Sequence, residues 1–227
     1  TINKTINLFK DTKVSAGGSV ANTISMVANL GNRCAFIGRR KNDTQGKLFS
    51  ESMSSSNILL PNSEVEFGEA SSTCLVMITP NGERTMLTYL GASTNLTEDD
   101  VDLALIEDSK IVYLEGYLFD LPEAKKLFFT LADKQEELGF EFALSLSDSF
   151  CVTRHKEDFL KLLDKKVKIV FSNKEEIETL FSCSVEKALI NSSDKILINI
   201  STLAEKGAMV YSNGNLIKKD SFSVEVK

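Results

Sequence analysis

From residue 98 onward, short β-rich apolar runs alternate with longer runs that have helical periodicity. The pattern predicts strands over residues 110–115, 140–146, 167–171 and 195–200. It predicts helices over residues 98–107, 121–138, 155–163, 173–181 and 185–190. Parallel strands need a crossover segment between them, so this order favours βαβ units. We therefore predict an α/β fold, with a mostly parallel sheet and helices on both faces.

Two Asn-Gly pairs predict β-hairpins. The first, in Pro80-Asn81-Gly82, separates extended runs over residues 72–79 and 83–89. It stands outside the alternation, so we expect a small separate β element over roughly residues 65–92. The second, Asn213-Gly214, predicts a hairpin over residues 208–217.

A glycine pair opens the first helical run, over residues 19–30. Gly17 and Gly18 have no side chain, so a ligand can approach their backbone closely. Ser19 is the expected N-cap, and Asn22 offers a side-chain amide about one turn into the helix. Unpaired amides and the helix dipole favour a polar ligand there. A tight turn without any ligand explains the same two glycines more simply.

Several motifs, in sequence order, resemble those of the ribokinase-like, or PfkB, carbohydrate and nucleoside kinases. The first signature is Gly-Gly-x-x-x-Asn22, followed by Phe36-Ile-Gly38 and Asp43-x-x-Gly46. Val20 stands where that family usually has a small residue. Three later segments resemble the bacterial adenosine-kinase-like branch: Glu83-Arg-Thr-Met86, Tyr113-Leu-Glu-Gly-Tyr-Leu118, and residues 144–155. The resemblance covers essentially the whole chain.

The resemblance implies a ribokinase-like fold, with residues 1–227 as a single but incomplete kinase domain and the first hairpin as a β lid. It also implies transfer of the ATP γ-phosphoryl group to a hydroxymethyl group of a nucleoside or sugar, with adenosine as the first choice. The implied cofactors are ATP and Mg²⁺.

Polar side chains close successive predicted strands, where open α/β sheets bind ligands. They are Glu115, Ser145, Ser147, Asp148, Ser172, Asn173 and Thr202. Each could equally be a helix cap or strand terminator when taken alone. Asn173 with Glu176 has the spacing of a capping box, which is compatible with a ligand role.

The resemblance gives some of these residues roles. Gly17, Gly18 and Asn22 would contact substrate hydroxyls, and Glu115 would lie on the substrate side near the phosphate and metal. Asn173 and Glu176 would serve the Mg-nucleotide, with Glu176 as the residue that holds the metal. Thr202 and Gly207 would contact the nucleotide phosphates, although Ala204 replaces the first glycine of the family's Thr-x-Gly-x-x-Gly loop.

The chain contains no Gly-x-Gly-Asp, the motif that supplies the family's anion hole and catalytic base. We therefore assign no catalytic residue, expect that the chain is cut at both ends, and expect negligible kinase activity from it alone. The alternative is a non-catalytic ligand-binding or interaction remnant of such a kinase. A dinucleotide-dependent oxidoreductase is disfavoured, because Gly-x-Gly-x-x-Gly is also absent.

The amino-acid composition restricts the kinds of partner that we expect. The net charge of -6 is spread among interspersed acidic and basic residues, which argues against nucleic-acid and membrane partners. Cys34, Cys74, Cys151 and Cys183 form no C-x-x-C pair, and with the single His155 they give no zinc signature. We expect buried free thiols and a cytoplasmic protein, and we leave a homodimer open as a partner arrangement. His155 has no carboxylate partner in the sequence, so we expect an ordinary helix-start residue.

Overall fold

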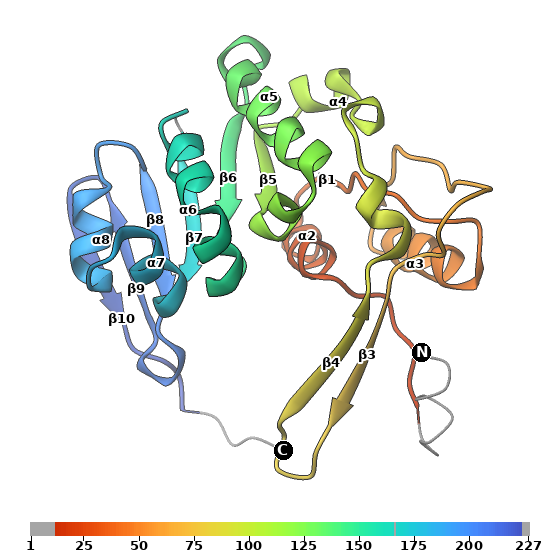
Figure 1. The fold of residues 1–227 in the computed structure, drawn as a ribbon, viewed down its shortest axis with the longest axis horizontal. Helices are drawn as coiled ribbons and strands as arrows, with labels where there is room; N and C mark the ends of the chain where they lie inside the picture. The colour runs from red at the N-terminus through yellow and green to blue at the C-terminus, as the bar shows by residue number, and fades with distance from the viewer. Residues whose placement is uncertain (1–11, 166, 224–227) are drawn as a thin grey trace. The chain divides into compact units, whose positions relative to one another are not determined.

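The computed structural model describes residues 12–165 and 167–223. It divides into two compact units, Thr1–Val101 and Asp102–Lys227, and each is described by itself (Figure 1). The expected single domain over residues 1–227 therefore stays a prediction.

The first unit has a small α/β core. Its elements are α2 (Ser19–Asn29), β1 (Cys34–Ala35), α3 (Thr44–Ser55) and β2 (Ile58–Leu59), with β1 parallel to β2. Ala21, Met53 and Ile58 form its buried centre. Regular pairing between β1 and β2 covers two residues on each strand, and one further bond joins the Phe36 amide to the Leu59 carbonyl.

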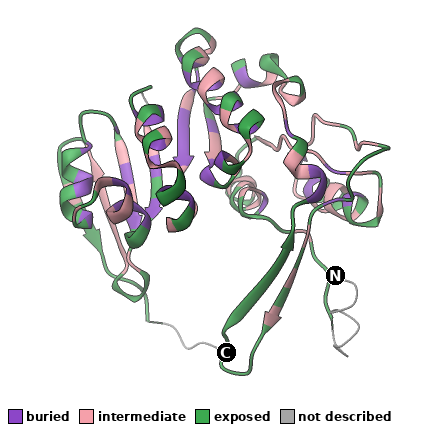
Figure 2. Ribbon diagram, viewed as in Figure 1, coloured by how far each residue is buried: buried purple, intermediate pink, exposed green. Residues whose placement is uncertain are grey.

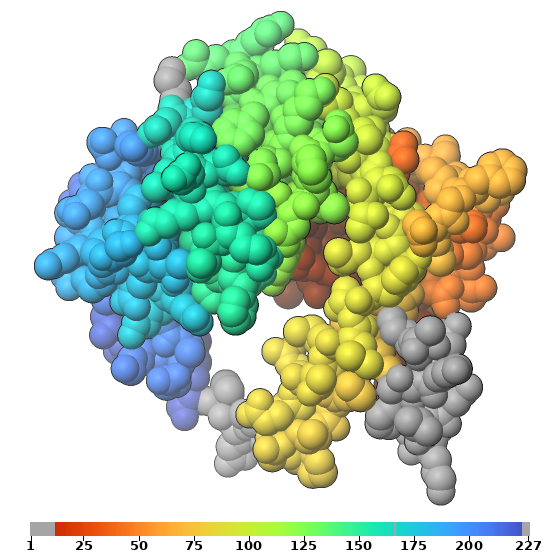
Figure 3. Space-filling model, in the orientation of Figure 1, coloured from red at the N-terminus to blue at the C-terminus, as the bar shows by residue number. Residues whose placement is uncertain are grey.

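The predicted first hairpin is confirmed. Strands β3 (Thr73–Ile78) and β4 (Arg84–Tyr89) pair antiparallel in a sheet of their own. Gly82 in the turn has a φ of 85°, which a residue without Cβ adopts at little cost. All of β4 is exposed (Figure 2). The space-filling view shows the hairpin as a narrow arm that extends from the rest of its unit (Figure 3).

The second unit contains a six-stranded sheet. Its strands are β5 (Ile111–Glu115), β6 (Glu141–Ser145), β7 (Ile169–Asn173), β8 (Ile198–Thr202), β9 (Ala208–Ser212) and β10 (Asn215–Lys219). They lie in the order β10-β9-β8-β7-β6-β5. Strands β5 to β8 are parallel, and β9 and β10 add the antiparallel hairpin predicted from Asn213-Gly214. The mostly parallel α/β sheet is therefore confirmed.

Helices α5 (Pro122–Leu138), α6 (Ser149–Leu163), α7 (Lys174–Phe181) and α8 (Val185–Asn191) pack on one face of this sheet (Figure 1). Helical cover on its second face stays a prediction. Helix α6 begins six residues before the expected start at His155, because Asp148 caps it by accepting from the Cys151 amide at 2.7 Å.

The expected helix over residues 98–107 is wrong in its first half. Thr97 and Asp100 form a capping box around a single 3₁₀ turn, η2 (Glu98–Asp100). The chain is then extended at Val101, and Asp102 caps a new short helix, α4 (Leu103–Glu107). Two caps close together thus split one periodic run into two helices. The remaining 3₁₀ turns are η1 (Gly91–Asn95), η3 (Gly116–Asp120) and η4 (Ala204–Lys206).

Aromatic packing fixes the segment that follows β5. Phe119 of η3 is stacked on Phe159 of α6, with ring centroids 4.4 Å apart and ring planes 9° apart. Both rings are at most 1% exposed. A Cβ on Gly116 would lie 2.6 Å from Phe159, so only glycine lets the two segments approach this closely. This packing holds η3, and with it the end of β5, against α6.

Within the part of the chain that the structure describes, no helix combines the length and apolar character that membrane crossing requires.

Candidate functional site

The parallel strands of the second unit end at one edge of the sheet and bring the predicted polar residues together there. Glu115, Asn173 and Thr202 are the last residues of β5, β7 and β8. Asp148 follows β6 and caps α6. The sequence argument that these residues share a sheet edge is therefore correct.

A cavity of about 1000 Å³ opens at the β7 and β8 end of this edge. Asn173, Thr202 and Gly207 all line it, together with Ala204. Three lysines and four glutamates also line it: Lys174, Lys206, Lys218, Glu175, Glu178, Glu186 and Glu205. Three of the four predicted nucleotide residues thus face a common space. The fourth, Glu176, is not among the lining residues that the structure describes.

Asn173 and Glu176 form a full capping box. The Glu176 carboxylate accepts from the Asn173 backbone amide at 2.9 Å and from its Nδ2 at 2.6 Å. In return, Asn173 Oδ1 accepts from the Glu176 amide at 2.9 Å. These contacts close the first turn of α7 and hold Glu176 at 4% exposure. The structural interpretation of this motif is therefore confirmed, whatever ligand it also serves.

Burial raises the pKa of the Glu176 carboxyl, and the nearby Asp148 and Glu175 act in the same direction. The Tyr117 phenol responds to the same carboxylates. Burial raises its pKa, as do the neighbouring carboxylates of Asp148, Glu115 and Glu176. The three carboxylates, at the end of β5, at the N-cap of α6 and in the first turn of α7, thus lie near Tyr117. Such a concentration of negative charge is relieved by a bound cation.

Glu115 is 6% exposed, and the Tyr113 hydroxyl donates to its Oε1 at 3.0 Å. The Glu115 side chain is therefore buried at the sheet edge, and Tyr113 of the same strand orients it.

The loop after β8 has a strained residue. Ala204 has a φ of 52°, in the left-handed region that favours glycine. Gly207 has a φ of 87°, and a Cβ there would lie 2.0 Å from the Lys219 carbonyl oxygen. The Leu203 amide donates to the Gly207 carbonyl at 2.7 Å and closes the loop. The backbone conformation therefore explains why a glycine is expected at position 204 and required at position 207.

The remaining predicted residues lie in the first unit, at the start of α2. Gly18, with a φ of 118°, is the N-cap, so the expectation that Ser19 caps the helix is wrong. Asn22 is exposed, and its backbone amide donates to the Gly18 carbonyl at 2.8 Å. Within the described chain, nothing lies within 4 Å of a Cβ built on Gly17. Substrate binding at this helix entry and a cleft shared with Asn173 and Glu176 both stay predictions.

Comparison with known proteins identifies the family. The model of the pfkB family of carbohydrate kinases matches residues 2–227. The chain belongs to the pfkB family. Its likeness to solved structures agrees, and confirms the ribokinase-like fold that the sequence motifs implied.

The structures of two bacterial relatives superpose over nearly the whole chain. Adenosine kinase from Sinorhizobium meliloti has a TM-score of 0.91 and 30% identity, over 99% of this chain and 69% of that one. A probable sugar kinase from Rhizobium etli has a TM-score of 0.90 and 31% identity, over 98% and 68%. Probable fructokinase-4 from Arabidopsis thaliana is 22% identical over 92% of this chain and 67% of its own length. The chain thus spans about two thirds of each of these relatives, and shorter matches include fructokinase from Solanum tuberosum, 26% identical over 31% of its length.

The Asp43-x-x-Gly46 part of the pfkB signature has a structural explanation in this chain. Asp43 caps α3, and its carboxylate accepts from the amides of Gly46 at 2.8 Å and Ser71 at 2.9 Å. A Cβ on Gly46 would lie 2.0 Å from the Lys41 carbonyl oxygen. This pair therefore ties α3 to the segment that precedes β3.

Two expectations about titratable residues were wrong in this pfkB-family chain. His155 does have a carboxylate partner, because its Nε2 lies 2.7 Å from Asp120 Oδ1. Asp120 lies 35 residues away in the sequence, so no local pattern could have revealed the pair. The four thiols are free, as expected, but Cys74 is exposed and only Cys151 among them is fully buried.

Proposed function

We propose that this chain binds ATP and a small hydroxylated substrate, as part of a phosphotransferase that moves the γ-phosphoryl group to a hydroxymethyl group of a nucleoside or sugar. The observation that carries the proposal is the cavity at the sheet edge, which Asn173, Thr202 and Gly207 line together. Membership of the pfkB family supports the same reaction class.

Thr202 and the loop after it would bind the nucleotide phosphates. The Thr202 hydroxyl lies at the cavity wall, 3.4 Å from the Ser172 carbonyl, and can rotate to donate to a phosphate oxygen. Gly207 adds no side chain to this wall, so phosphate can approach the backbone closely. The lysines of the lining, Lys174, Lys206 and Lys218, supply positive charge.

The residues present fit a magnesium ion. Glutamates outnumber lysines around the cavity, four to three, so a polyphosphate entering without a metal would meet net negative charge. Bound Mg²⁺ would neutralise charge on the phosphate oxygens during transfer. Glu176 would hold it through water, because both carboxylate oxygens of Glu176 already accept hydrogen bonds from Asn173.

Gly17, Gly18 and Asn22 would bind the substrate hydroxyls, with Glu115 on the side toward the phosphate and metal. The helix entry at Gly18 supports this role, since Gly18 has no side chain to block an approaching ligand and the exposed Asn22 amide can donate to and accept from hydroxyl groups. Adenosine is the first candidate, because a relative with 30% identity over nearly all of this chain is an adenosine kinase. Fructose and ribose follow, since other relatives are fructokinases and a probable sugar kinase.

A thermal-shift panel of ATP–Mg²⁺, adenosine, ribose and fructose tests the proposal. Ligand at 100 times its dissociation constant stabilises the native state by about 2.7 kcal/mol, which is several degrees. Thr202→Val should reduce the ATP–Mg²⁺ shift and leave the substrate shift unchanged. Thr153→Val, at an exposed position on α6, is the matched control. Absence of any shift with ATP–Mg²⁺ in the wild-type chain would sink the proposal.

The second candidate is ligand binding without turnover, which the lack of any Gly-x-Gly-Asp in these 227 residues favours. An assay of radiolabelled phosphate transfer from ATP to adenosine separates the two. Binding without phosphorylation supports the second candidate for this polypeptide. Robust phosphorylation would refute our expectation that the chain alone is inactive.

A further inference from the structure

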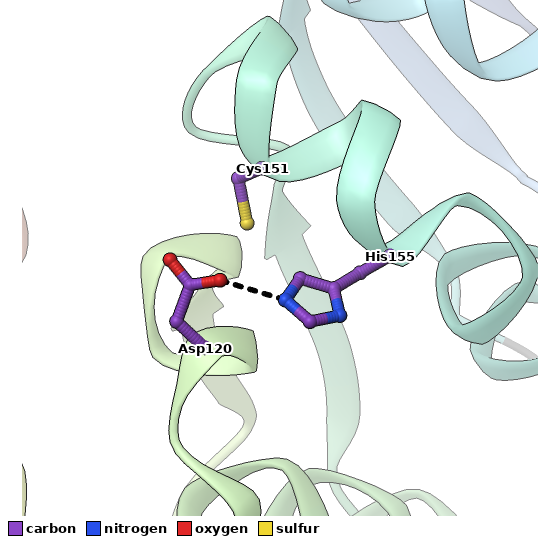
Figure 4. A group of neighbouring side chains, drawn as sticks. All are labelled: Asp120, Cys151 and His155. Carbon is purple, nitrogen blue, oxygen red and sulfur yellow. Dashed lines mark hydrogen bonds and ion pairs between the residues drawn. The ribbon is translucent and has the colours of Figure 1, made fainter.

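Three side chains of different chemistry, none of them assigned to ATP or substrate, meet at η3 and the start of α6. Asp120 closes η3, and Cys151 and His155 lie one turn apart on α6 (Figure 4). Their carboxylate oxygen, thiol sulfur and imidazole nitrogen all lie within 4.8 Å of one another. These are the oxygen, sulfur and nitrogen donors found at zinc sites.

We propose that Asp120, Cys151 and His155 form a site for a borderline-soft divalent metal ion of the zinc class, with water as the fourth ligand. A thiolate and an imidazole select zinc, cobalt or similar ions over magnesium, which prefers oxygen ligands. The site is therefore chemically distinct from the proposed magnesium region around Glu176.

The local backbone positions the three donors for this role. His155 departs from helical geometry, with φ −119° and ψ 23°, and its ring turns toward Asp120 (Figure 4). Its Nε2 lies 2.7 Å from Asp120 Oδ1. A tetrahedral zinc ion with bonds of about 2.0–2.3 Å places its donor atoms roughly 3.3–3.6 Å apart. The present separations therefore require shifts on the order of 1 Å.

The surroundings are rigid on one side and open on the other. The stacked Phe119 and Phe159 rings hold η3 against α6, so the backbone of Asp120 stays beside that of the two α6 residues and the shifts that metal binding requires fall on the three side chains. Cys151 is fully buried, whereas the Asp120 side chain is 47% exposed. Asp120 is therefore the ligand that an ion arriving from solvent meets first.

A neighbouring charged side chain, Arg154, can keep Asp120 oriented when a metal ion is bound. Arg154 Nη2 donates to Asp120 Oδ2 at 2.6 Å, which leaves Oδ1 for the metal. Arg154 Nε also donates to Oδ1 at 3.0 Å, and the ion would displace that contact. Contacts of this kind, one shell beyond the ligands, orient metal-binding carboxylates.

Metal binding changes the proton positions on two of the three ligands. Lys125 Nζ lies 3.2 Å from His155 Nδ1, and an ammonium can only donate, so without metal Nδ1 accepts and Nε2 carries the ring proton. Metal binding at Nε2 moves that proton to Nδ1, so Lys125 must turn away from the ring and keep its bond to Asp158 Oδ2 at 2.7 Å, while Nδ1 faces the same carboxylate at 3.9 Å. The Cys151 thiol gives up its hydrogen bond to the Gly116 carbonyl, loses its proton to solvent and binds as thiolate, so one proton leaves for each ion bound.

Cobalt titration of the full 227-residue chain tests the site. The background is a variant with Cys34→Ser, Cys74→Ser and Cys183→Ser, so that Cys151 is the sole thiol. We expect a near-ultraviolet charge-transfer band from thiolate to Co²⁺ that saturates at one equivalent and is displaced by Zn²⁺ but not by Mg²⁺. Absence of this band at pH 8, or its displacement by Mg²⁺, would overturn the proposal.

Two further variants keep the test independent of folding at the buried cysteine. His155→Gln and Asp120→Asn retain the thiol and should weaken cobalt binding at least about tenfold. Asp133→Asn, which removes an exposed partner of Lys165 on the same unit, is the matched control and should leave binding unchanged. Unchanged cobalt affinity in both His155→Gln and Asp120→Asn, with far-ultraviolet circular dichroism intact, would refute the assignment.

Discussion

Asn173 and Thr202 lie directly opposite each other, as the paired last residues of β7 and β8, and both line the same cavity. Asn173 caps α7, and Thr202 directly precedes the loop that follows β8. The register of two parallel strands thus brings a helix cap and a loop hydroxyl to one wall. Substitutions in the helix after Asn173 and in the loop after Thr202 should change the stability of the second unit.

Glu176→Gln should stabilise the second unit at neutral pH. Burial raises the pKa of the Glu176 carboxyl above its ordinary value of 4.5, so its charged form is disfavoured in the folded state. The folded state is therefore favoured at low pH, and this contribution is lost as pH rises from 4.5 through the raised pKa. Glutamine carries no charge, and its single oxygen can still accept from the Asn173 backbone amide, although its NH2 group cannot accept from Asn173 Nδ2. Urea unfolding at pH 7 and pH 4 should show the variant gaining stability over the wild type only at pH 7.

Glu157→Gln, at an exposed position of α6, is the control for this effect. If the two variants respond to pH alike, the burial of Glu176 is not the cause. The proposed role of Glu176 predicts in addition that Glu176→Gln weakens the thermal shift with ATP–Mg²⁺.

Ala204→Gly should stabilise the loop after β8. Ala204 has a φ of 52°, where an alanine costs about 1 kcal/mol more than a glycine. The added freedom of glycine in the unfolded chain offsets part of this gain. We expect a net increase of about 0.5 kcal/mol in the free energy of unfolding, measured in urea. Ala104→Gly, on the exposed side of helix α4, should instead lose about 0.5–1 kcal/mol. Equal losses in both variants would contradict the strain at position 204.

Gly207→Ala should be strongly destabilising. A Cβ there would lie 2.0 Å from the Lys219 carbonyl oxygen, and the φ of 87° with ψ of −128° suits glycine alone. The free energy of unfolding should fall by about 2–4 kcal/mol. Gly139→Ala separates clash from conformation, since Gly139 also has a positive φ of 77° but meets nothing within 4 Å in the described chain. That control should lose only about 1 kcal/mol, and comparable losses would show that the contact with Lys219 is unimportant.

Asp43→Ala should destabilise the first unit by about 1–2 kcal/mol, because α3 loses its N-cap and Ser71 loses an acceptor. Although burial acts to raise it, hydrogen bonds from Ser71 and Gly46 hold the pKa of the Asp43 carboxyl below its ordinary value of 3.8. The stabilisation is therefore present above pH 3.8 and is lost as pH falls through the lowered pKa.

Urea unfolding of wild type and variant at pH 6 and pH 3 measures the Asp43 effect. The difference between the two proteins should shrink at pH 3. Asp99→Ala, at an exposed position of η2, is the control and should change little at either pH. A difference that grows toward acid pH would show that the Asp43 carboxylate does not stabilise this unit.

Local chemistry made much of the fold predictable from the sequence. Periodicity placed the parallel strands and their helices, and the Asn-Gly pairs placed both hairpins, because these signals depend on neighbouring residues alone. The capping box of Asn173 and Glu176 was predictable for the same reason. The failures were also local, such as the split of the expected helix over residues 98–107 by two competing caps.

The sequence by itself determined the α/β class, the family motifs and the polar residues at the strand ends. The tertiary structure alone decided which of those residues share a cavity, how deeply Glu176 is buried, and that Asp120 meets Cys151 and His155. The physical reason is the distance along the chain over which each signal acts. Helix and turn signals act over about four residues, whereas a cavity or a donor cluster depends on strand register and ring packing between segments far apart in the chain.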